Sequence, residues 1–325
     1  MDWICENTGL INNDLCDLKA ESDFVTLIEN VKEGYLETPV IETEKFSEIS
    51  PSWNSNTDEN SSVELFIKLR IESEWTPYIS YGIWSTNGKN IGIKDHYSDE
   101  LIRVTEDRIF VKNGRFGDAA QIKVILRGNN PRLRLIAFST DGGEDEPIEG
   151  NYLRVLQNVP LISQLASGHK DAHVICSPTS LTMALKYHGK DVDLDQVTRG
   201  TLDSGNDAYG NWPQNVAFAG EQGMRAYTKK CKSINPVKNF IAKGIPVVAS
   251  VCMKEKEMLD GAISAFPSGH LMVVVGFDII DGIEYVVVND PAANSNTEVR
   301  KYYRLDQWVM VWRHYIYSIT MNIEH

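Results

Sequence analysis

The chain has 325 residues, which is more than one average domain and fewer than three. Hydrophobic residues make up 42% of it and charged residues 24%, fractions that are typical of a folded chain with a core and exclude a disordered or fibrous one. No apolar run approaches the ~18 residues that a membrane helix needs, so no membrane span is predicted.

The charge is unevenly distributed along the chain. Residues 1–150 hold 28 acidic and 15 basic side chains, whereas residues 151–325 hold 17 of each, so the whole net charge of −13 lies in the first half. An acidic surface repels phosphate backbones, and nucleic acid is therefore excluded as an expected partner. The acidity either favours a basic ligand or keeps the module soluble, and the second interpretation is the simpler one.

The first 23 residues are acidic and polar, with no basic or apolar segment of the kind found in a signal peptide. If Met1 is the native start, the sequence predicts a cytoplasmic protein. If an export signal was removed, the protein is instead secreted or held at the cell surface.

The first half is predicted to be an all-β module. Residues 24–34 suggest a short helix, and residues 51–62 are polar enough to predict a loop. Five segments with the patterns of strands follow, at residues 63–71, 78–85, 101–112, 119–128 and 131–140. Short strands at this spacing predict a sandwich-like module over residues 1–150, in which the sequence gives residues 1–50 no clear role.

An acidic segment with glycine and proline, residues 141–151, predicts the domain boundary. Helices are then predicted over residues 177–189, 193–203, 211–223 and 235–244. A strand follows at residues 245–253, and two further strands flank Asp281-Gly282, a dipeptide that favours a β-hairpin. Helices followed by an antiparallel sheet predict an α+β domain over residues 151–325.

Cys176 is the thiol with the most suggestive neighbourhood. It precedes Ser177-Pro178 at the expected start of a helix, where backbone amides and the helix dipole stabilise a thiolate. Proline is favoured in the first turn of a helix, which supports this placement. A thiolate is a nucleophile at neutral pH, but a free cysteine is also often a small buried apolar residue.

His270 and Asp290 are the expected partners of that thiol. The hairpin through Asp281-Gly282 brings both to the same end of the sheet, where the histidine acts as a base and the carboxylate orients it. A strict two-residue turn pairs His270 with Ala293, so a bulge, a longer turn or sheet twist has to bring Asp290 closer. Asn289 is the alternative orienting residue, since neighbouring strand residues face opposite sides.

Gln164, twelve residues before Cys176, is a candidate donor for an oxyanion. A side-chain amide beside the thiol, together with a backbone N–H at the helix start, can hold the negative oxygen of a tetrahedral intermediate. The alternative interpretation is a solvated loop glutamine.

The remaining cysteines and histidines give weaker signals. Five cysteines without a CxxC pair exclude a zinc knuckle or redox dithiol, and no histidine spacing suits a metal, so neither a metal nor an organic cofactor is expected. Cys231 lies among lysines and is predicted to be exposed or at an edge, whereas Cys252 is predicted to be in the core.

Tryptophans in the first half have two interpretations. Trp53, Trp75 and Trp84 either form a stacking platform for a sugar or peptide ligand or belong to the core, which is the more frequent place for tryptophan in strands. Three further aromatic residues are candidates for lining a substrate cleft: Tyr209, Trp212 and Trp308.

Four segments in this order resemble the C39-like cysteine peptidases of papain-like fold (the peptidase_C39_2 type): VPLISQ, ICSPTSLTMALKYHG, GHLMVVVGFD and VVVNDPAA. The resemblance covers about residues 157–320. It implies Cys176 as nucleophile, His270 as general base and acid, Asp290 as orienting residue and Gln164 as oxyanion donor. The family usually has glycine directly after the cysteine, and Ser177 in its place keeps the backbone N–H but is expected to crowd the pocket.

The sequence therefore predicts a cysteine peptidase that hydrolyses a peptide or isopeptide bond in a peptide or protein substrate, with the amino-terminal module in recruitment or regulation. Transporter-linked relatives that cleave double-glycine leader peptides carry membrane spans and an ATPase, neither of which is predicted here, so that role does not carry over. Two alternatives stay open: a peptide- or glycan-binding protein on an inactive scaffold, and an acyltransferase using the same residues.

Overall fold

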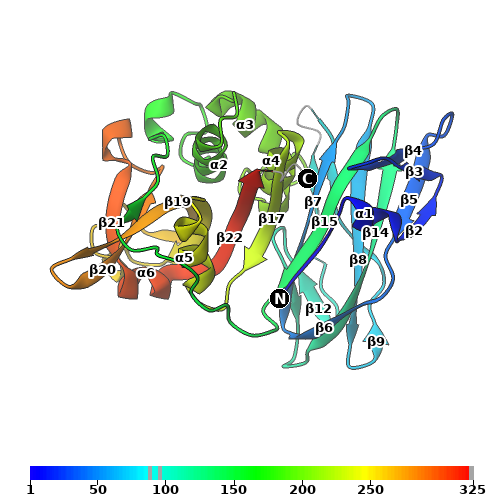
Figure 1. Ribbon diagram of the computed structural model, residues 1–325, viewed down its shortest axis with the longest axis horizontal. Helices are drawn as coiled ribbons and strands as arrows, with labels where there is room; N and C mark the ends of the chain where they lie inside the picture. The colour runs from blue at the N-terminus through cyan, green and yellow to red at the C-terminus, as the bar shows by residue number, and fades with distance from the viewer. Residues whose placement is uncertain (87–89, 94–96, 322–325) are drawn as a thin grey trace. The chain divides into compact units, whose positions relative to one another are not determined.

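The computed structural model describes residues 1–86, 90–93 and 97–321, and strands outnumber helices among them (Figure 1). The chain divides into two compact units. The first comprises Met1–Glu144 and Arg199–Lys230, and the second Asp145–Thr198 and Cys231–His325. No helix in the described part of the chain is long and apolar enough to span a membrane.

The first unit contains two antiparallel sheets. One has the order β12-β13-β7-β15-β4-β3, and β1 pairs with residues 135–139 of β15, on the same edge that β4 pairs with at residues 132 and 133. Its strands are β12 (Ile102–Val104), β13 (Ile109–Val111), β7 (Glu48–Asn56), β15 (Arg132–Thr140), β4 (Val25–Leu27), β3 (Leu18–Ala20) and β1 (Asp2–Glu6). The short helix α1 (Thr8–Ile11) follows β1.

The second sheet of this unit has the order β11-β10-β8-β14-β5-β2, with β6 on β14 and β9 on β8. Its strands are β11 (Ile91–Gly92), β10 (Ile79–Trp84), β8 (Ser62–Ile71), β14 (Gly117–Arg127), β5 (Glu33–Glu37), β2 (Asp14–Cys16), β6 (Ile41–Phe46) and β9 (Glu74–Trp75). Every second residue of β8 is buried, as its alternating sequence predicts.

Two expectations for the first half are wrong. Residues 24–34 form no helix: β4 and the start of β5 occupy them, because Val25 and Leu27 alternate with Thr26 and face the core. Residues 51–56 form most of β7 rather than a loop, and eight of the nine residues of β7 are buried. The expected strand at residues 101–112 is a hairpin of β12 and β13.

The second unit is built on one antiparallel sheet in which β22, β18, β19, β20 and β21 are neighbours in that order, with β16 beside β19. These strands are β22 (Trp312–Met321), β18 (Val247–Met253), β19 (Phe266–Ile280), β20 (Ile283–Asn289), β21 (Arg300–Arg304) and β16 (Val155–Leu156). The β19–β20 hairpin turns at Asp281 and Gly282, which have φ values of 51° and 79°. Both values suit the tight turn that the sequence predicts.

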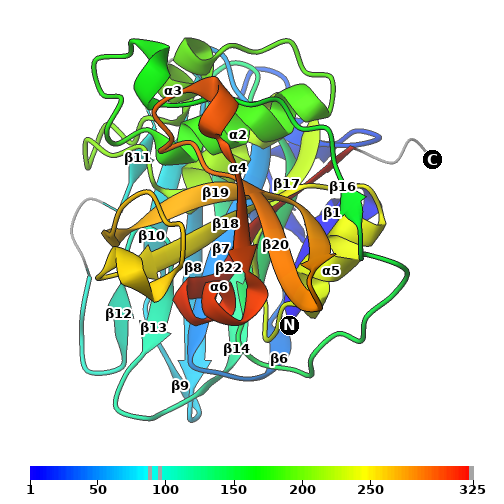
Figure 2. The same ribbon diagram turned by 90° about the vertical axis from the view of Figure 1, so that its left-hand side faces the viewer.

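Helices cover this sheet, and α2 (Cys176–Tyr187) packs against β19 and β18 (Figure 2). The helices α3 (Leu194–Thr201), α5 (Asn235–Ala242) and α6 (Leu305–Val311) lie later in the chain. All four predicted helices are present, whereas the sequence did not predict α6, β21 and β22. An apolar core under the sheet includes Val247, Met272 and Trp308.

The fourth predicted helix, α4 (Trp212–Glu221), and the unpredicted strand β17 (Met224–Lys230) pack with the first unit, against β7. The assignment of residues 1–150 and 151–325 to two domains stays a prediction. The packing nevertheless shows that a segment of the second half is folded together with the first.

Candidate active site

Cys176 is the first residue of α2 and is partly exposed, whereas the nine residues after it are buried. Ile175 supplies no capping side chain, so the first amides of the helix are not occupied by a cap. Pro178 lies in the first turn, where a missing N–H breaks no helical hydrogen bond. The hydroxyl of Ser180 donates to the carbonyl of Leu271 at 3.0 Å, which fixes α2 to β19 beside His270.

His270 lies near the start of β19 and is 2% exposed. Its Nε2 is 2.7 Å from Oδ1 of Asp290. The ring of Phe266 stacks on the imidazole, with centroids 3.9 Å apart and planes inclined by 10°. Because Asp290 engages Nε2, Nδ1 is the ring nitrogen left for the thiol of Cys176.

Asp290 follows the last residue of β20 and is fully buried. Its Oδ1 also accepts the backbone N–H of Ala292 at 3.0 Å, and its Oδ2 accepts the hydroxyl of Tyr303 at 3.2 Å. A bulge between Val274 and Gly276 shifts the hairpin register by one residue, so that Val273 faces Asn289. This bulge is one of the devices that the sequence required to bring Asp290 closer to His270.

Asn289, the alternative orienting residue, faces away from the histidine. Its Nδ2 donates to the carbonyl of Pro160 at 3.1 Å, and its Oδ1 accepts Nε of Arg300 at 2.6 Å. Asp290 is therefore the partner of His270 in this structure.

The electrostatics of the site favour a charged pair. Burial by itself raises the pKa of the Cys176 thiol, but a hydrogen bond and the charge of His270, with the amides of Leu271 and Ser177, outweigh it and bring that pKa below its usual range. Burial disfavours the imidazolium, yet the charge of Asp290 and its hydrogen bond raise the pKa of His270 to about 10. Burial likewise opposes the carboxylate, but His270 and the groups around it lower the pKa of Asp290.

The sequence profile of the Peptidase_C39 like family matches residues 156–318, which is half of the chain. The chain belongs to the Peptidase_C39 like family.

Solved structures similar to this chain include two peptidase domains. One is a double glycine motif protease from an AMS/PCAT transporter in complex with the leader peptide, with 19% identity over 55% of this chain and 100% of that chain and a TM-score of 0.36. The other is the peptidase domain of Streptococcus ComA, a bi-functional ABC transporter, with 14% identity over 50% and 97% and a TM-score of 0.34.

A third similar structure is the C-terminal CBM6 of LamC, a marine laminarinase from Zobellia galactanivorans. It has 10% identity over 42% of this chain and 98% of that chain, with a TM-score of 0.25. The comparison with curated proteins gives no match.

Gln164, the expected oxyanion donor of this C39-like chain, is 4% exposed, so the interpretation as a solvated loop residue is wrong. Its backbone N–H donates to the carbonyl of Pro291 at 2.9 Å, directly after Asp290. Its side-chain Nε2 donates to the carbonyl of Ala172 at 2.8 Å, four residues before Cys176. These bonds hold Gln164 between the two loops that carry the acid and the thiol.

Ser177, which departs from the family pattern, turns its side chain away from the thiol. Its hydroxyl lies 2.8 Å from the hydroxyl of Tyr317 on β22, and both residues are buried. The structure gives this serine a place in the core under α2.

Several weaker expectations are corrected by burial. Cys231 is 1% exposed rather than at a surface or edge, and Cys252 is half-buried rather than in the core. Trp53 and Trp84 are core residues, which excludes a platform of the three tryptophans, and Trp75 is half-buried. The candidates for a cleft include two buried residues and one that is half-buried: Trp212, Trp308 and Tyr209.

The sequence did not reveal Phe266 and Tyr303, which contact the histidine and the aspartate. Phe266 lies four residues before His270, which in a regular strand separates two side chains by about 13 Å. The register of β19 with β18 shifts between Val251 and Met253, so the ring contact depends on this irregularity, which the strand pattern does not indicate. Tyr303 lies on β21, a strand that was not predicted. No group of three or more metal-binding side chains is present in the described ranges.

Proposed function

We propose that this chain is a cysteine peptidase that hydrolyses a peptide or isopeptide bond through an acyl-enzyme on Cys176. One observation carries the proposal: His270 is hydrogen-bonded to Asp290 and also interacts with Cys176. This interaction lowers the pKa of the thiol. A thiolate beside an imidazolium is the active form of such enzymes.

In the proposed reaction, the thiolate of Cys176 attacks the carbonyl carbon of the scissile bond, forming a C–S bond. The carbonyl oxygen becomes negative, and the amides at the start of α2 with Nε2 of Gln164 supply donors for it. His270 then gives its proton to the leaving nitrogen as the C–N bond breaks. In the second half, His270 takes a proton from water, the hydroxide attacks the thioester, and Cys176 leaves as thiolate.

A papain-like arrangement is part of the proposal. The thiol lies at the start of a helix that packs on an antiparallel sheet, and the sheet supplies the histidine and the carboxylate from one hairpin. The papain-like proteases use the same roles with cysteine, histidine and asparagine. Here a carboxylate takes the place of that amide, which favours the imidazolium more strongly than a neutral group does.

The test is cleavage of a peptide library by wild-type protein and by Cys176→Ala, with new peptide termini identified by mass spectrometry. The proposal expects new termini with the wild type and none with a folded Cys176→Ala protein. Glycylglycine added to the reaction separates hydrolysis from acyl transfer, because a transferase extends its products by the dipeptide. A wild type that leaves the library intact but retains peptides on a column contradicts catalysis and favours the binding alternative.

A further inference from the structure

Residues 199–230 lie within the peptidase segment of 156–318, yet they fold with Met1–Glu144 as one compact unit. They comprise the end of α3, the helix α4 and the strand β17. We term the contact surface between residues 199–230 and residues 1–144 the seam. Its chemistry indicates what the amino-terminal residues do for the peptidase segment.

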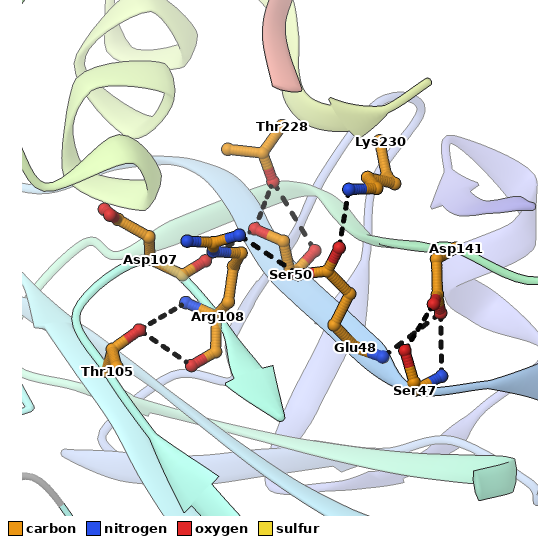
Figure 3. A network of polar contacts seen from close by, with 9 residues as sticks. All are labelled: Ser47, Glu48, Ser50, Thr105, Asp107, Arg108, Asp141, Thr228 and Lys230. Atoms are coloured by element: carbon orange, nitrogen blue, oxygen red, sulfur yellow. Dashed lines mark hydrogen bonds and ion pairs between the residues drawn. The ribbon is translucent and has the colours of Figure 1, made fainter. Parts of the chain in front are cut away.

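Three alternate residues of β7 hydrogen-bond to β17: Ser50, Ser52 and Asn54. The side-chain amide of Asn54 reproduces a strand pair: its Oδ1 accepts the N–H of Ala226 at 3.0 Å, and its Nδ2 donates to the carbonyl of Ala226 at 2.7 Å. The hydroxyl of Ser52 accepts the N–H of Thr228 at 3.4 Å, and the hydroxyl of Ser50 lies 2.9 Å from that of Thr228 (Figure 3). These polar residues of β7, of which Ser52 and Asn54 fall in the predicted loop, can be buried because β17 provides their hydrogen-bond partners.

Basic side chains of β17 meet acidic side chains of residues 1–144. Lys230 is 2.6 Å from Glu48, a pair that Figure 3 shows beside Asp141. Lys229 is 2.5 Å from Asp2, and Arg225 is 2.9 Å from Glu6. Part of the acidic excess of the first half is therefore matched by β17. The Lys229–Asp2 and Lys230–Glu48 pairs are largely buried, which makes the loss of either partner unfavourable, whereas the side chains of Arg225 and Glu6 are 25% and 30% exposed.

The contacts are close as well as polar. A Cβ at Gly220 of α4 would lie 2.6 Å from Cβ of Asn54, so only glycine fits at this position. The ring of Tyr227 packs in one apolar cluster with Leu135 and Ala137 of β15.

The loop before α4 is anchored in the same unit. The buried carboxylate of Asp203 accepts the backbone N–H of Gly92 at 2.9 Å, and Nδ2 of Asn90 donates to the carbonyl of Gly200 at 2.7 Å. Both ends of the segment thus depend on residues 1–144.

We infer that the amino-terminal residues 1–144 are a structural component of the peptidase, on which residues 199–230 fold, and not a module that can be detached from it. Separation exposes an apolar cluster and leaves strand groups, hydroxyls and charges without the partners that match them, which is unfavourable for both sides. The peptidase segment of 156–318 is therefore incomplete without its amino-terminal neighbour.

The test is performed on the full chain with a recognition sequence for a site-specific protease inserted between Glu144 and Asp145, in an exposed stretch. After cleavage, the account expects residues 1–144 and 145–325 to elute together from a sizing column and to separate only in denaturant. Fragments that separate under native conditions and each stay folded overturn the inference. The readout is association, so it is independent of peptidase activity.

Seam variants show whether the association depends on these contacts. Reversing the charge in Glu6→Arg is expected to weaken association of the cleaved fragments by about five- to tenfold, and the pair Glu6→Arg with Arg225→Glu is expected to restore it. Asn54→Asp, which removes the donor to Ala226, weakens it as well. Glu33→Arg is the control, since Glu33 pairs with Arg127 inside residues 1–144. Association that the seam variants and the control affect equally contradicts the inference.

Discussion

The replacement Asp290→Asn tests the charge relation on which the proposed site depends. Asparagine keeps the shape of the side chain and an oxygen that accepts Nε2 of His270, but it removes the buried charge 2.7 Å away. The pKa of His270 is raised from 6.5 to about 10, which corresponds to a preference for the imidazolium on the order of 5 kcal/mol. The variant is expected to return the pKa of His270 toward 6.5.

The loss of the imidazolium in turn returns the pKa of the Cys176 thiol toward its usual value of 9.0. At pH 7 a thiol of that pKa is about 1% ionised, so the alkylation of Cys176 at pH 7 is expected to slow by about 10- to 100-fold. The alkaline side of the pH profile is expected to move as well. The imidazolium of His270 is fully formed below the ordinary pKa of histidine, and it is lost as the pH rises through about 10 in the wild type but at lower pH in the variant.

The assay is alkylation by iodoacetamide from pH 5 to pH 11, with the modified cysteine identified by peptide mapping. Asp278→Asn is the control, because Asp278 lies on β19, the strand of His270, and its carboxylate accepts the N–H of Ile279 rather than contacting the histidine. The reasoning is refuted if Asp290→Asn and the wild type show the same alkylation profile, or if Cys176 in the wild type reacts no faster than the half-buried Cys252.

Three further predictions concern contacts that the structure places around the site and the seam. Tyr303→Phe removes the donor to Oδ2 of Asp290, and it is expected to lower kcat by about 3- to 30-fold with little change in KM for a cleaved library peptide. An unchanged kcat contradicts a positioning role for this hydroxyl. Ser177→Gly is expected to lower the free energy of unfolding by about 1–2 kcal/mol in urea titrations, because it removes the hydrogen bond to Tyr317 and adds backbone freedom. The pH profile of Cys176 alkylation is expected to stay the same, and a changed pH profile shows that the serine acts on the thiol instead. Gly220→Ala is expected to lower the free energy of unfolding by about 1–3 kcal/mol, because the added Cβ forces Asn54 aside. An unchanged midpoint of the urea unfolding curve shows that Asn54 moves aside without cost.

The local sequence pattern predicted helices and strands correctly where the buried residues recur with the period of a helix or strand. Residues 63–71 alternate because one face of β8 is buried, and the helix after Cys176 and the turn at Asp281-Gly282 carry their own signals. It failed for residues 51–56, whose polar side chains indicate a loop when read alone. Their partners are α4 and β17, more than 160 residues further along the chain, which no local pattern contains.

In the candidate site, too, the sequence predicted some residues and missed others. Cys176, His270 and Asp290 were predicted, and the structure brings them together, because a helix start and a hairpin bring residues together by rules that the sequence displays. The choice of Asp290 over Asn289 depended on a bulge and on Arg300, neither of which the sequence marks. Tyr303 contacts Asp290 from a strand that begins ten residues later, and the segment between carries no strand signal.

The proposed mechanism requires Cys176 to carry the acyl group of a cleaved peptide bond. Its most direct measurement is the mass of protein quenched in acid during turnover of a library peptide, followed by mapping of the adduct. The account predicts a thioester on Cys176 that disappears as the substrate is consumed, and neither adduct nor cleavage in Cys176→Ala. Cleavage that persists in Cys176→Ala, or an adduct on Cys252 in place of Cys176, contradicts it.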